Sequence, residues 1–427
     1  MIEPFNGMKI TEDTILQPGT YLVPDGIEVV ADNVMLDGNG ALLIGLEEGS
    51  GVRVNGRSNI TLKNLRLQNY RHAIAATDCN NLTVANCQTR GTAEVSANTI
   101  FLDIWKTADH AYGGGIFLNR VQNSTVHDND LQHQMNGLLA YSCQQLTVRS
   151  NNASYCSGFG FYLSETCDSQ FLNNYADYCC RYHPRGDKAG HMGADAASFV
   201  IVRTSCRNLF RGNMARLGGD GFFLAGLTPQ REHVGCNDNI FEENDGSYSP
   251  NIAFEGTFSR GNIYRRNKAN HCNYGFWLGF SAECQLEENQ IFHNRQAGIA
   301  VENGYGMIVT GNDFRLNQHG ILLWSKYVAS FAVAVPQNDT SRDWLIEKNR
   351  FWRNNKAIRI AANQDHGIRD MPSSNPIPPP PQRHTIRGNR IFDNRLGVET
   401  LNAAETVMEQ NEWQANVEAN MRLLESL

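Results

Sequence analysis

The chain has 427 residues, of which 41% are hydrophobic, and 37 basic against 44 acidic side chains give it a net charge of −7. It contains no run of Lys and Arg that would follow a phosphate backbone, so nucleic acid is not an expected partner. No stretch reaches the roughly 18 apolar residues of a membrane span, so a membrane is not an expected partner either. Length and composition predict a globular protein with a sizeable core.

The N-terminal segment, residues 1–45, is predicted to form a strand cap that covers the first part of the fold. The opening "MIEPFNGMKITEDT" lacks the basic region and apolar core of a signal peptide. We therefore expect a cytoplasmic protein if the chain is complete, and an extracellular or periplasmic one if a leader has been removed.

Residues 46–411 carry an internal repeat in which an Asn recurs after 22 or 23 residues wherever the segment is compact. The repeated positions are Asn129, Asn151, Asn174, Asn213, Asn244, Asn267, Asn289, Asn312, Asn349, Asn389 and Asn411, with a looser early copy at Asn64 and Asn86. A fixed period in this range is typical of a solenoid. Alternating runs such as "GIFLN" and "STVHDN" predict strands rather than helices.

The repeat predicts an all-β fold in which each coil contributes three short strands and the coils stack in parallel, ~4.8 Å apart. Identical side chains then lie above one another, and the repeated Asn forms a ladder of amides along the stack. We expect a single domain, 1–427, with about thirteen coils in 46–411. The segment 412–427 is predicted to be a C-terminal cap in which "ANVEANMRLLESL" forms a helix.

The 11 cysteines are odd in number and include no C-x-x-C pair, so a disulfide framework is not expected. Cys156, Cys179 and Cys272 each lie five residues after a repeated Asn. This position predicts reduced, buried thiols that stack with the repeat rather than a redox or metal site.

The runs "NITLKNLRLQN", "NNLTVANC", "GILLWS" and "GIAVEN" resemble the right-handed parallel β-helix superfamily, with its pectate-lyase-like, polygalacturonase-like and periplasmic copper-protein-like repeats. The resemblance covers residues 25 to 415. It implies a right-handed parallel β-helix but not one activity, because the superfamily includes lyases, hydrolases, uronate epimerases, phage tailspikes and non-enzymatic carriers.

Five long segments interrupt the repeat, and all of them flank the same strand of the coil: 92–112, 181–196, 226–235, 325–343 and 362–384. Loops on both sides of one sheet predict a groove whose floor is the outer face of that sheet. The alternative is that the segments are neutral surface insertions.

Because side chains alternate along a strand, the residues one and three places after each predicted core position, such as Phe161, Val200 and Phe254, face outward and form a stripe of aromatic and charged side chains on the floor. Such a stripe suits a saccharide, whose ring stacks on aromatic side chains and whose hydroxyls bond to charged ones. The predicted substrate-binding residues are Tyr162, Arg203, Trp277, Trp324 and Arg359, with His191 and Asp195 from the second loop. The alternative for each Trp is packing beneath the loops.

Three carboxylates are candidates for catalysis: Asp220 in "LGGDGFF", Glu255 in "NIAFEG" and Glu302 in "GIAVEN". Glu255 and Glu302 should lie ~10 Å apart, a separation that favours an inverting glycosidase. In the polygalacturonase-like hydrolases that the chain resembles, an Asp-Gly or Asp-Asp pair before this strand carries the acid and base, and Asp220-Gly221 matches that placement. The NTD and RIK motifs of those enzymes are missing here. We expect Glu255 to be desolvated and hold a proton, and Asp220 to be more open to solvent and ionised.

The favoured function is therefore glycoside hydrolysis of an oligo- or polysaccharide. One alternative is a uronate lyase or epimerase, for which Lys188, Arg203 and Arg359 could neutralise the uronate carboxylate. The other is a non-catalytic binding or structural solenoid. His319 in "QHG" is predicted to be a turn residue, no metal or other cofactor is expected, and a homo-oligomer is compatible with the sequence.

Overall fold

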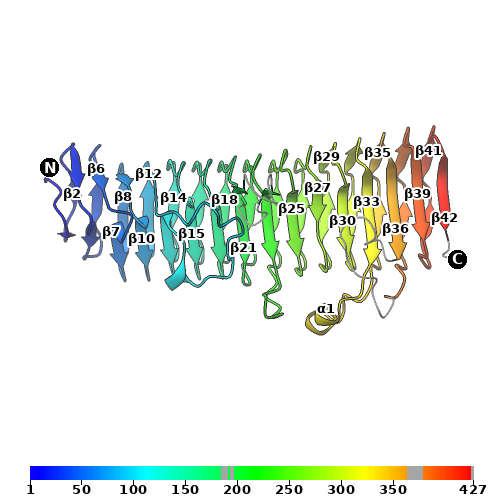
Figure 1. Cartoon of the computed structure of the whole chain (residues 1–427), viewed down its shortest axis with the longest axis horizontal. Coiled ribbons are helices and arrows are strands. Elements are labelled where there is room, and N and C mark those ends of the chain that lie inside the picture. Colours follow the sequence, from blue (N-terminus) through cyan, green and yellow to red (C-terminus); the bar gives the residue numbers. More distant parts are fainter. Residues whose placement is uncertain (184–190, 193–196, 363–377, 425–427) are drawn as a thin grey trace. The chain divides into compact units, whose positions relative to one another are not determined.

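The computed structural model describes residues 1–183, 191–192, 197–362 and 378–424. The chain divides into two compact units, an N-terminal unit of residues 1–220 and a C-terminal unit of residues 221–427. Each is built from stacked coils whose strands form long parallel sheets, which confirms the predicted all-β, β-helical fold (Figure 1). The single-domain organisation remains a prediction.

The N-terminal unit contains three parallel sheets. Sheet 1 has the order β1 (Met8–Ile10), β4 (Ile27–Val29), β7 (Ser50–Asn55), β10 (His72–Thr77), β13 (Gly114–Asn119), β15 (Leu138–Tyr141), β17 (Phe161–Ser164) and β21 (Phe199–Val202). Sheet 2 has the order β2 (Thr14–Ile15), β5 (Met35–Asp37), β8 (Ser58–Lys63), β11 (Asn80–Ala85), β14 (Thr125–His127), β16 (Thr147–Arg149), β18 (Gln170–Leu172) and β22 (Leu209–Arg211). Sheet 3 comprises β12 (Gln88–Arg90), β9 (Arg66–Gln68), β6 (Leu42–Ile44) and β3 (Thr20–Leu22). Outside these sheets lie a 3-10 turn, η1 (Ala108–His110), and an antiparallel pair, β19 (Tyr182–His183) and β20 (His191–Met192).

The C-terminal unit repeats this arrangement. Its sheet 1 has the order β23 (Phe222–Ala225), β25 (Ile252–Thr257), β27 (Tyr274–Trp277), β30 (Ala297–Glu302), β33 (His319–Ser325), β36 (Lys356–Ala362), β39 (Leu396–Leu401) and β42 (Ala419–Leu424). Sheet 2 comprises β24 (Ile240–Glu242), β26 (Ile263–Arg265), β28 (Gln285–Glu287), β31 (Ile308–Thr310), β34 (Leu345–Glu347), β37 (Thr385–Arg387) and β40 (Val407–Glu409). Sheet 3 comprises β29 (Gln290–Phe292), β32 (Asp313–Arg315), β35 (Arg350–Trp352), β38 (Arg390–Phe392) and β41 (Glu412–Gln414).

The repeated Asn side chains stack in one turn of the coil, as predicted. In the N-terminal unit, the Nδ2 of Asn151 donates to the Oδ1 of Asn174 at 3.0 Å. In the C-terminal unit, Asn267 donates to Asn289 at 3.1 Å and Asn289 to Asn312 at 2.9 Å. Each amide also bonds to a backbone carbonyl of a neighbouring coil, so the buried polar groups are satisfied along the stack.

Aromatic side chains fill the core inside the coils. Phe222, Phe254 and Phe276 stack on successive strands with ring centroids 4.9 and 5.0 Å apart. Their spacing follows that of the strands because parallel register places equivalent residues directly above one another. Cys156, Cys179 and Cys272 are buried, as predicted for stacked thiols.

The prediction for the N-terminal cap agrees with the structure better than the prediction for the C-terminal cap. Residues 1–45 form strands, as predicted, but β1 to β6 already belong to the three sheets. The helical prediction for the C-terminal cap is wrong for its described residues, 412–424, because β41 and β42 continue the coils. A second ladder of Asn side chains runs from Asn354 to Asn394 and on to Asn416, which accepts a hydrogen bond from Asn394 at 3.1 Å. In addition, β42 pairs with β39.

Two register predictions are corrected. The core position of β21 is Phe199, which pairs with Phe161, and not Val200. The turn after β21 holds one extra residue, which Arg203 and Thr204 accommodate with positive φ angles of 48° and 55°. In the coil before Asn129, Cys87 occupies the position equivalent to the repeated Asn, and its N–H donates to the Oδ1 of Asn129. The predicted early copy, Asn86, therefore lies one residue before the ladder position.

The described parts of the long segments flank sheet 1, as predicted. The loop after β33 contains α1 (Ala329–Ala334), drawn beside the strands in Figure 1. Phe331 of α1 packs edge-on against the stacked pair Phe258 and Phe280, at 5.0 and 4.9 Å. No helix among the described residues is long and apolar enough to cross a membrane.

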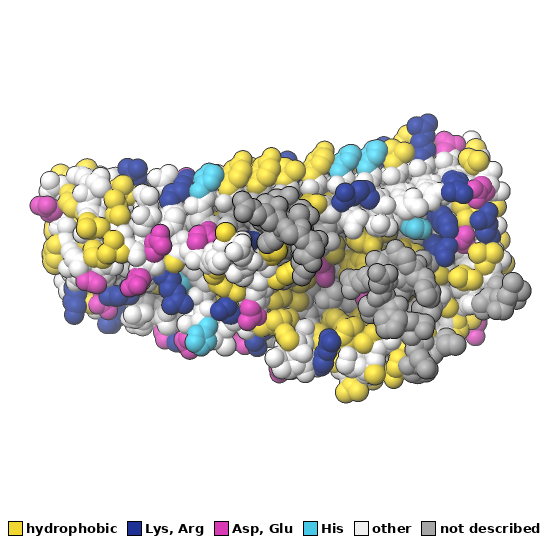
Figure 2. Space-filling model, in the orientation of Figure 1, with side chains coloured by type: hydrophobic (Ala, Val, Ile, Leu, Met, Phe, Trp, Pro, Cys, Tyr) yellow, Lys and Arg dark blue, Asp and Glu magenta, His cyan; other side chains and the backbone are white. Residues whose placement is uncertain are grey.

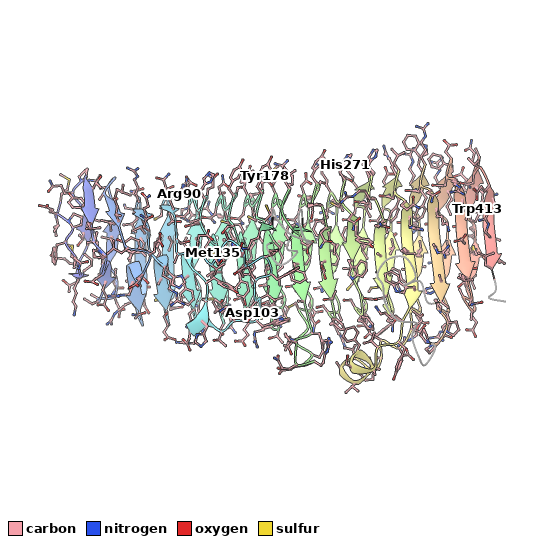
Figure 3. All side chains as sticks on the ribbon, in the orientation of Figure 1. Arg90, Asp103, Met135, Tyr178, His271 and Trp413 are labelled. Atoms are coloured by element: carbon pink, nitrogen blue, oxygen red, sulfur yellow. The ribbon has the colours of Figure 1, made fainter. Side chains whose placement is uncertain are left out.

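The outer turns also carry stacked side chains. His271 stacks on Tyr248 at 4.9 Å and on His293 at 4.6 Å, and in the N-terminal unit Tyr178 stacks on Tyr155 at 5.0 Å. Figure 2 shows hydrophobic and histidine side chains along an upper edge, and Figure 3 labels Tyr178 and His271 there. These exposed rings follow the coil repeat, and those of the C-terminal unit lie in turns a few residues before strands of sheet 1, such as His271 before β27.

Replacing one amide of the ladder should destabilise the protein. Asn289→Ala removes the bonds to Asn312 and to the carbonyl of Tyr264, and the acceptor that Asn267 uses. Because each buried partner left unsatisfied costs about 1–3 kcal/mol, we expect a total loss of roughly 3 kcal/mol or more, seen as a lower midpoint of urea unfolding. The exposed neighbour Gln290→Ala is the control; equal midpoints for both variants would contradict the ladder's role.

Candidate functional site

The outer face of sheet 1 in the C-terminal unit carries one side chain per coil in strict register. From β25 to β42 this row contains Glu255, Trp277, Ala300, Leu322, Arg359, Glu399 and Arg422. The next outward row contains Glu302 and Trp324, which pair on β30 and β33. The predicted floor residues of this unit therefore do share one face.

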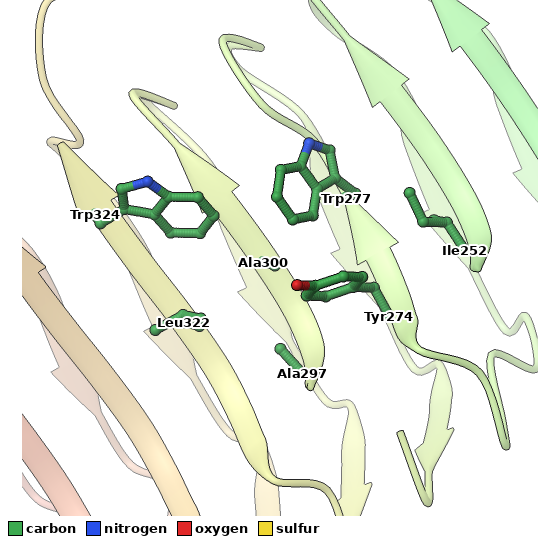
Figure 4. Packing of buried hydrophobic residues seen from close by; sticks show 7 residues of the cluster. All are labelled: Ile252, Tyr274, Trp277, Ala297, Ala300, Leu322 and Trp324. Carbon is green, nitrogen blue, oxygen red and sulfur yellow. The ribbon is translucent and has the colours of Figure 1, made fainter. Parts of the chain in front are cut away.

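The apolar part of this face is a packed cluster and not an open platform. Trp277 is 5% exposed and Trp324 is 0% exposed, and their rings meet edge to face at 5.6 Å. Tyr274 packs against Trp277 at 4.8 Å (Figure 4). The expectation of exposed stacking surfaces is therefore wrong for both indoles, which bury against their neighbours.

The three predicted catalytic carboxylates have different surroundings. Glu255 is half-buried and pairs in register with Trp277. Glu302 is buried and forms an ion pair with Lys326, with 3.5 Å between Nζ and Oε2. Asp220 is fully buried in the N-terminal unit, so the expectation that it is more open to solvent than Glu255 is wrong.

Tyr162 and Arg203 of the N-terminal unit hold the first long loop. The Tyr162 hydroxyl donates to the carbonyl of Ile104 at 2.8 Å, and Arg203 Nη2 donates to the carbonyl of Trp105 at 2.8 Å. Arg203 follows the end of β21 instead of lying on the floor, because of the one-residue shift in that coil. These contacts confirm that the loop 92–112 packs against sheet 1.

The second long loop lies partly outside the described residues. Asp195 is among the residues outside the description, as is Lys188. His191 lies in β20, and its side chain is not described. Their predicted roles stay predictions.

A charged cavity of about 240 Å³ lies at the β33, β36 and β39 part of sheet 1. Its lining consists of Gln318, His319, Asn355, Lys356, Arg395, Leu396, Glu418 and Arg422. Except for Arg422, which lies within β42, these residues begin or precede the strands of the last coils, where the parallel register stacks His319 on Lys356 and Lys356 on Leu396. The cavity therefore opens beside the predicted floor.

Ion pairs connect the lining of the cavity to Arg359 and Glu399 on the floor. The buried carboxylate of Glu399 contacts Arg359 and Lys356, the latter with Nζ at 2.5 Å from Oε2. Arg422 bonds to Glu418 at 2.9 Å and lies 3.7 Å from Glu399.

Among the described groups, positive charge is in excess around the cavity. Arg395 also pairs with Glu418, at 2.5 Å. The three cations of the described lining, Lys356, Arg395 and Arg422, outnumber the two described carboxylates that pair with them, Glu399 and Glu418. Such a surplus favours the binding of an anion.

His319 is held as a neutral imidazole at the edge of this cavity. Its Nδ1 lies 3.0 Å from the carbonyl oxygen of Gln296, which can only accept, so Nδ1 carries the hydrogen and Nε2 keeps its lone pair. Burial, together with the charges of Lys356 and Arg359, lowers the pKa of His319 to about 4. A neutral imidazole with a free lone pair can accept a proton.

Lys356 is also shifted by its surroundings. Burial lowers the pKa of its ammonium group to about 8, and the nearby guanidinium groups of Arg359, Arg422 and Arg395 act in the same direction. The cavity therefore combines a neutral base with cations on one side of the sheet.

Sequence reasoning found Arg359 on the neighbouring floor but did not find this cavity. It assigned His319 to a turn and did not single out Lys356, Arg395 or Arg422. His319 and Lys356 lie two residues before the core positions Ile321 and Ile358. A period-two count gives both positions the inward parity of the core residues, so it would not have placed them beside the floor, and Arg395 lies in the turn before β39.

The fold places the chain among right-handed β-helices, and a family model described as the right-handed β-helix region matches residues 49–213. A second model, described as periplasmic copper-binding protein (NosD), matches residues 207–426, which is more than half of the 427 residues. The chain belongs to this second family. No curated protein sequence matches it.

Several solved structures are similar in fold. The Azotobacter vinelandii mannuronan C-5 epimerase AlgE4 A-module is 11% identical, with 99% of this chain and 91% of that chain covered and a TM-score of 0.47. The periplasmic alginate epimerase AlgG is 10% identical, with coverages of 96% and 79% and a TM-score of 0.39. DFA-IIIase from Arthrobacter chlorophenolicus A6 is 13% identical, with coverages of 66% and 67% and a TM-score of 0.40. These proteins are carbohydrate-active, but identities this low bear on the fold alone.

The family's description raises the question of copper, which proteins hold through sulfur and imidazole ligands. Within the described part of the chain, no group of three or more His, Cys, Asp or Glu side chains is placed to hold a metal ion. Burial raises the pKa of the thiols of Cys87, Cys143 and Cys284 to about 12, which disfavours the thiolate that a metal needs. The described residues do not fit a copper centre, and we assign no step to one.

The coupling between His319 and Lys356 can be measured directly. Lys356→Met removes a positive charge that disfavours the imidazolium, so the pKa of His319 should rise from about 4, as followed by NMR titration of the imidazole. Lys348→Met, at an exposed lysine outside the cavity, is the control. An unchanged His319 pKa in Lys356→Met would show that the charge of Lys356 does not act on His319.

Proposed function

We propose that the chain binds an acidic polysaccharide built of uronate residues along the outer face of sheet 1 and acts on it as an epimerase or lyase. The observation that carries this proposal is the cavity in which a neutral His319 lies among Lys356, Arg395 and Arg422. A uronate offers a carboxylate to the cations and an adjacent carbon-bound proton to the base.

Epimerases and lyases that act on uronates share their first step, the removal of the proton at C5. Negative charge then spreads onto the carboxylate, so cations that neutralise this group lower the barrier. In this site Lys356 and Arg422 would hold the carboxylate, and Nε2 of His319 would accept the proton. The excess of positive charge supports binding of a uronate over a neutral sugar.

The two reactions differ in their second step. In an epimerase a proton returns to C5 from the opposite face, which inverts that carbon. In a lyase the bond from C4 to the glycosidic oxygen breaks, and a double bond forms between C4 and C5. The described residues do not favour one of these outcomes, and the products distinguish them.

A glycoside hydrolase is the second candidate function. The observation that favours it is the half-buried Glu255 beside Trp277 on the same face. It ranks second because Glu302, its predicted partner, is engaged by Lys326. Hydrolysis would also need no cation-rich cavity.

The experiment is to incubate the protein with a panel of neutral and uronate oligosaccharides in D2O. Deuterium at C5, seen by proton NMR, with intact chains supports an epimerase. Ultraviolet absorbance of an unsaturated uronate supports a lyase. New reducing ends without that absorbance support the hydrolase, and binding without any reaction supports a non-catalytic solenoid.

Substitutions in the cavity should affect turnover and binding differently. His319→Ala removes the proton acceptor and should lower kcat by about 10²–10⁴-fold. Lys356→Met removes a charged contact of about 1.5–3 kcal/mol and should lower kcat/KM by roughly 10–100-fold. His271→Ala, at an exposed outer-turn histidine, is the matched control, and normal kcat in His319→Ala would refute the assigned base.

The rate should depend on pH through the same two groups. His319 must be unprotonated to accept a proton, so activity should fall as the pH drops through about 4. Lys356 must be protonated to hold the carboxylate, so activity should also fall as the pH rises through about 8. We expect a bell-shaped profile of kcat/KM whose alkaline limb disappears in Lys356→Arg. An alkaline limb that persists unchanged in this variant would argue against Lys356.

A further inference from the structure

Two cysteines of the N-terminal unit occupy the same position in adjacent coils, outside the cavity described above. Cys167 and Cys206 are 39 residues apart, the same offset that separates the paired residues Gln170 and Leu209 of β18 and β22. Both lie in the turn between sheet 1 and sheet 2. Adjacent coils are ~4.8 Å apart, which lies within the ~4.4–6.8 Å between Cα atoms that a disulfide bridges.

The two residues already contact each other through Sγ of Cys167. The backbone N–H of Cys206 donates to this sulfur at 3.3 Å, and the Cys206 thiol is hydrogen-bonded to it. The Cys167 thiol itself donates to the carbonyl oxygen of Thr204 at 3.2 Å. Cys167 is half-buried, whereas Cys206 is 8% exposed.

The surroundings of Cys167 stabilise its thiolate. The hydrogen bond from the Cys206 thiol, followed by the Cys206 N–H and the charge of Arg207, lowers the pKa of Cys167 to about 6, although burial and Asp168 act in the opposite direction. Arg207 is held in place by Asp168, with Nε 2.8 Å from Oδ1. A thiolate that solvent reaches is the form of cysteine that attacks disulfides.

We propose that Cys167 and Cys206 form a redox-active dithiol, which a low-molecular-weight disulfide oxidises to a disulfide between adjacent coils. The Cys167 thiolate attacks one sulfur of the oxidant, forms a mixed disulfide and releases the first small thiolate. Cys206 then loses its proton and attacks Sγ of Cys167, which releases the second small thiolate. The two cysteines lose two electrons and two protons in total, and the oxidant is reduced to two thiols.

A second cysteine pair provides the internal control. Cys156 and Cys179 also lie in adjacent coils with their thiols hydrogen-bonded, but both are buried, at 1% and 0% exposure. Burial raises the pKa of Cys156 well above its usual value, so this pair lacks an accessible thiolate. Stacking alone therefore does not produce reactivity.

The new disulfide would tie the turn that carries Arg203. Arg203 lies three residues before Cys206 and donates to the carbonyl of Trp105 in the first long loop. Oxidation therefore fixes a turn that anchors this loop. This inference does not depend on the function proposed above.

The test is to treat the folded full-length chain with oxidised glutathione, alkylate the remaining thiols and map the peptides by mass spectrometry. We expect a disulfide-linked peptide pair containing Cys167 and Cys206, reversed by dithiothreitol, while Cys156 and Cys179 stay alkylatable after unfolding. Cys206→Ser should accumulate a glutathione adduct on Cys167, because the resolving thiol is missing. Cys167→Ser should form neither product at this turn.

Cys156→Ser should behave like the unaltered protein and serves as the matched control. In the unaltered protein, the rate of alkylation of Cys167 should rise with a midpoint near pH 6. Failure of the folded chain to link Cys167 to Cys206, or equal oxidation of Cys156 and Cys179, would overturn the proposal. The unaltered chain supplies both of these readouts, so the test does not depend on any variant folding.

Discussion

The hydrogen-bonded stacking of one coil on the next is the constraint on which every other feature depends. A single coil cannot satisfy its own backbone groups or bury its inner face, because its strands have no partners within the coil. The Asn ladder adds a side-chain bond at each step, such as the 2.9 Å contact between Asn289 and Asn312. Since each amide both donates and accepts along the stack, a slip by one residue would leave buried polar groups unsatisfied. The register is therefore fixed, and with it the direction of every side chain on sheet 1.

Fixed register explains how a short repeat creates concentrated chemistry. Side chains in equivalent positions lie about one strand spacing apart, so charged residues that are distant in sequence become neighbours. Lys356 and Arg359 share one carboxylate, that of Glu399 on the next strand, and Arg422 lies on the strand after it. Crowded cations are tolerated because the buried carboxylate offsets part of their repulsion.

The same stacking gives opposite properties to two cysteine pairs. Cys156 and Cys179 are buried inside the coil, and burial raises the pKa of Cys156, whereas Cys167 lies in a turn where a thiol, a backbone N–H and Arg207 favour the thiolate. Family membership does not distinguish such cases, because β-helices share their stacking while their activities differ. The chemistry of this chain depends on which positions of the coil carry polar residues and on how far solvent reaches them.

The sequence by itself determined the solenoid, the Asn ladder, the sheet flanked by the long segments and the row that contains Glu255, Trp277 and Arg359. These follow from spacing, because a repeat of fixed length states which residues are equivalent. Spacing failed where the coil changed locally: one extra residue in the turn at Arg203 and Thr204 shifted the core position to Phe199. The helical prediction also failed for the described residues 412–424, where β42 pairs with β39.

Only the tertiary structure decided what the outward side chains contact. Trp277 and Trp324 pack edge to face and are buried, and Glu302 meets Lys326 from the loop that follows β33. His319, predicted as a turn residue, became a neutral imidazole beside Lys356 because two strands 37 residues apart pair in register. The physical reason is that burial and electrostatic shifts depend on neighbours brought together by the long loops and by stacking. A repeat period specifies equivalence between coils, but it carries no information about the segments that interrupt it.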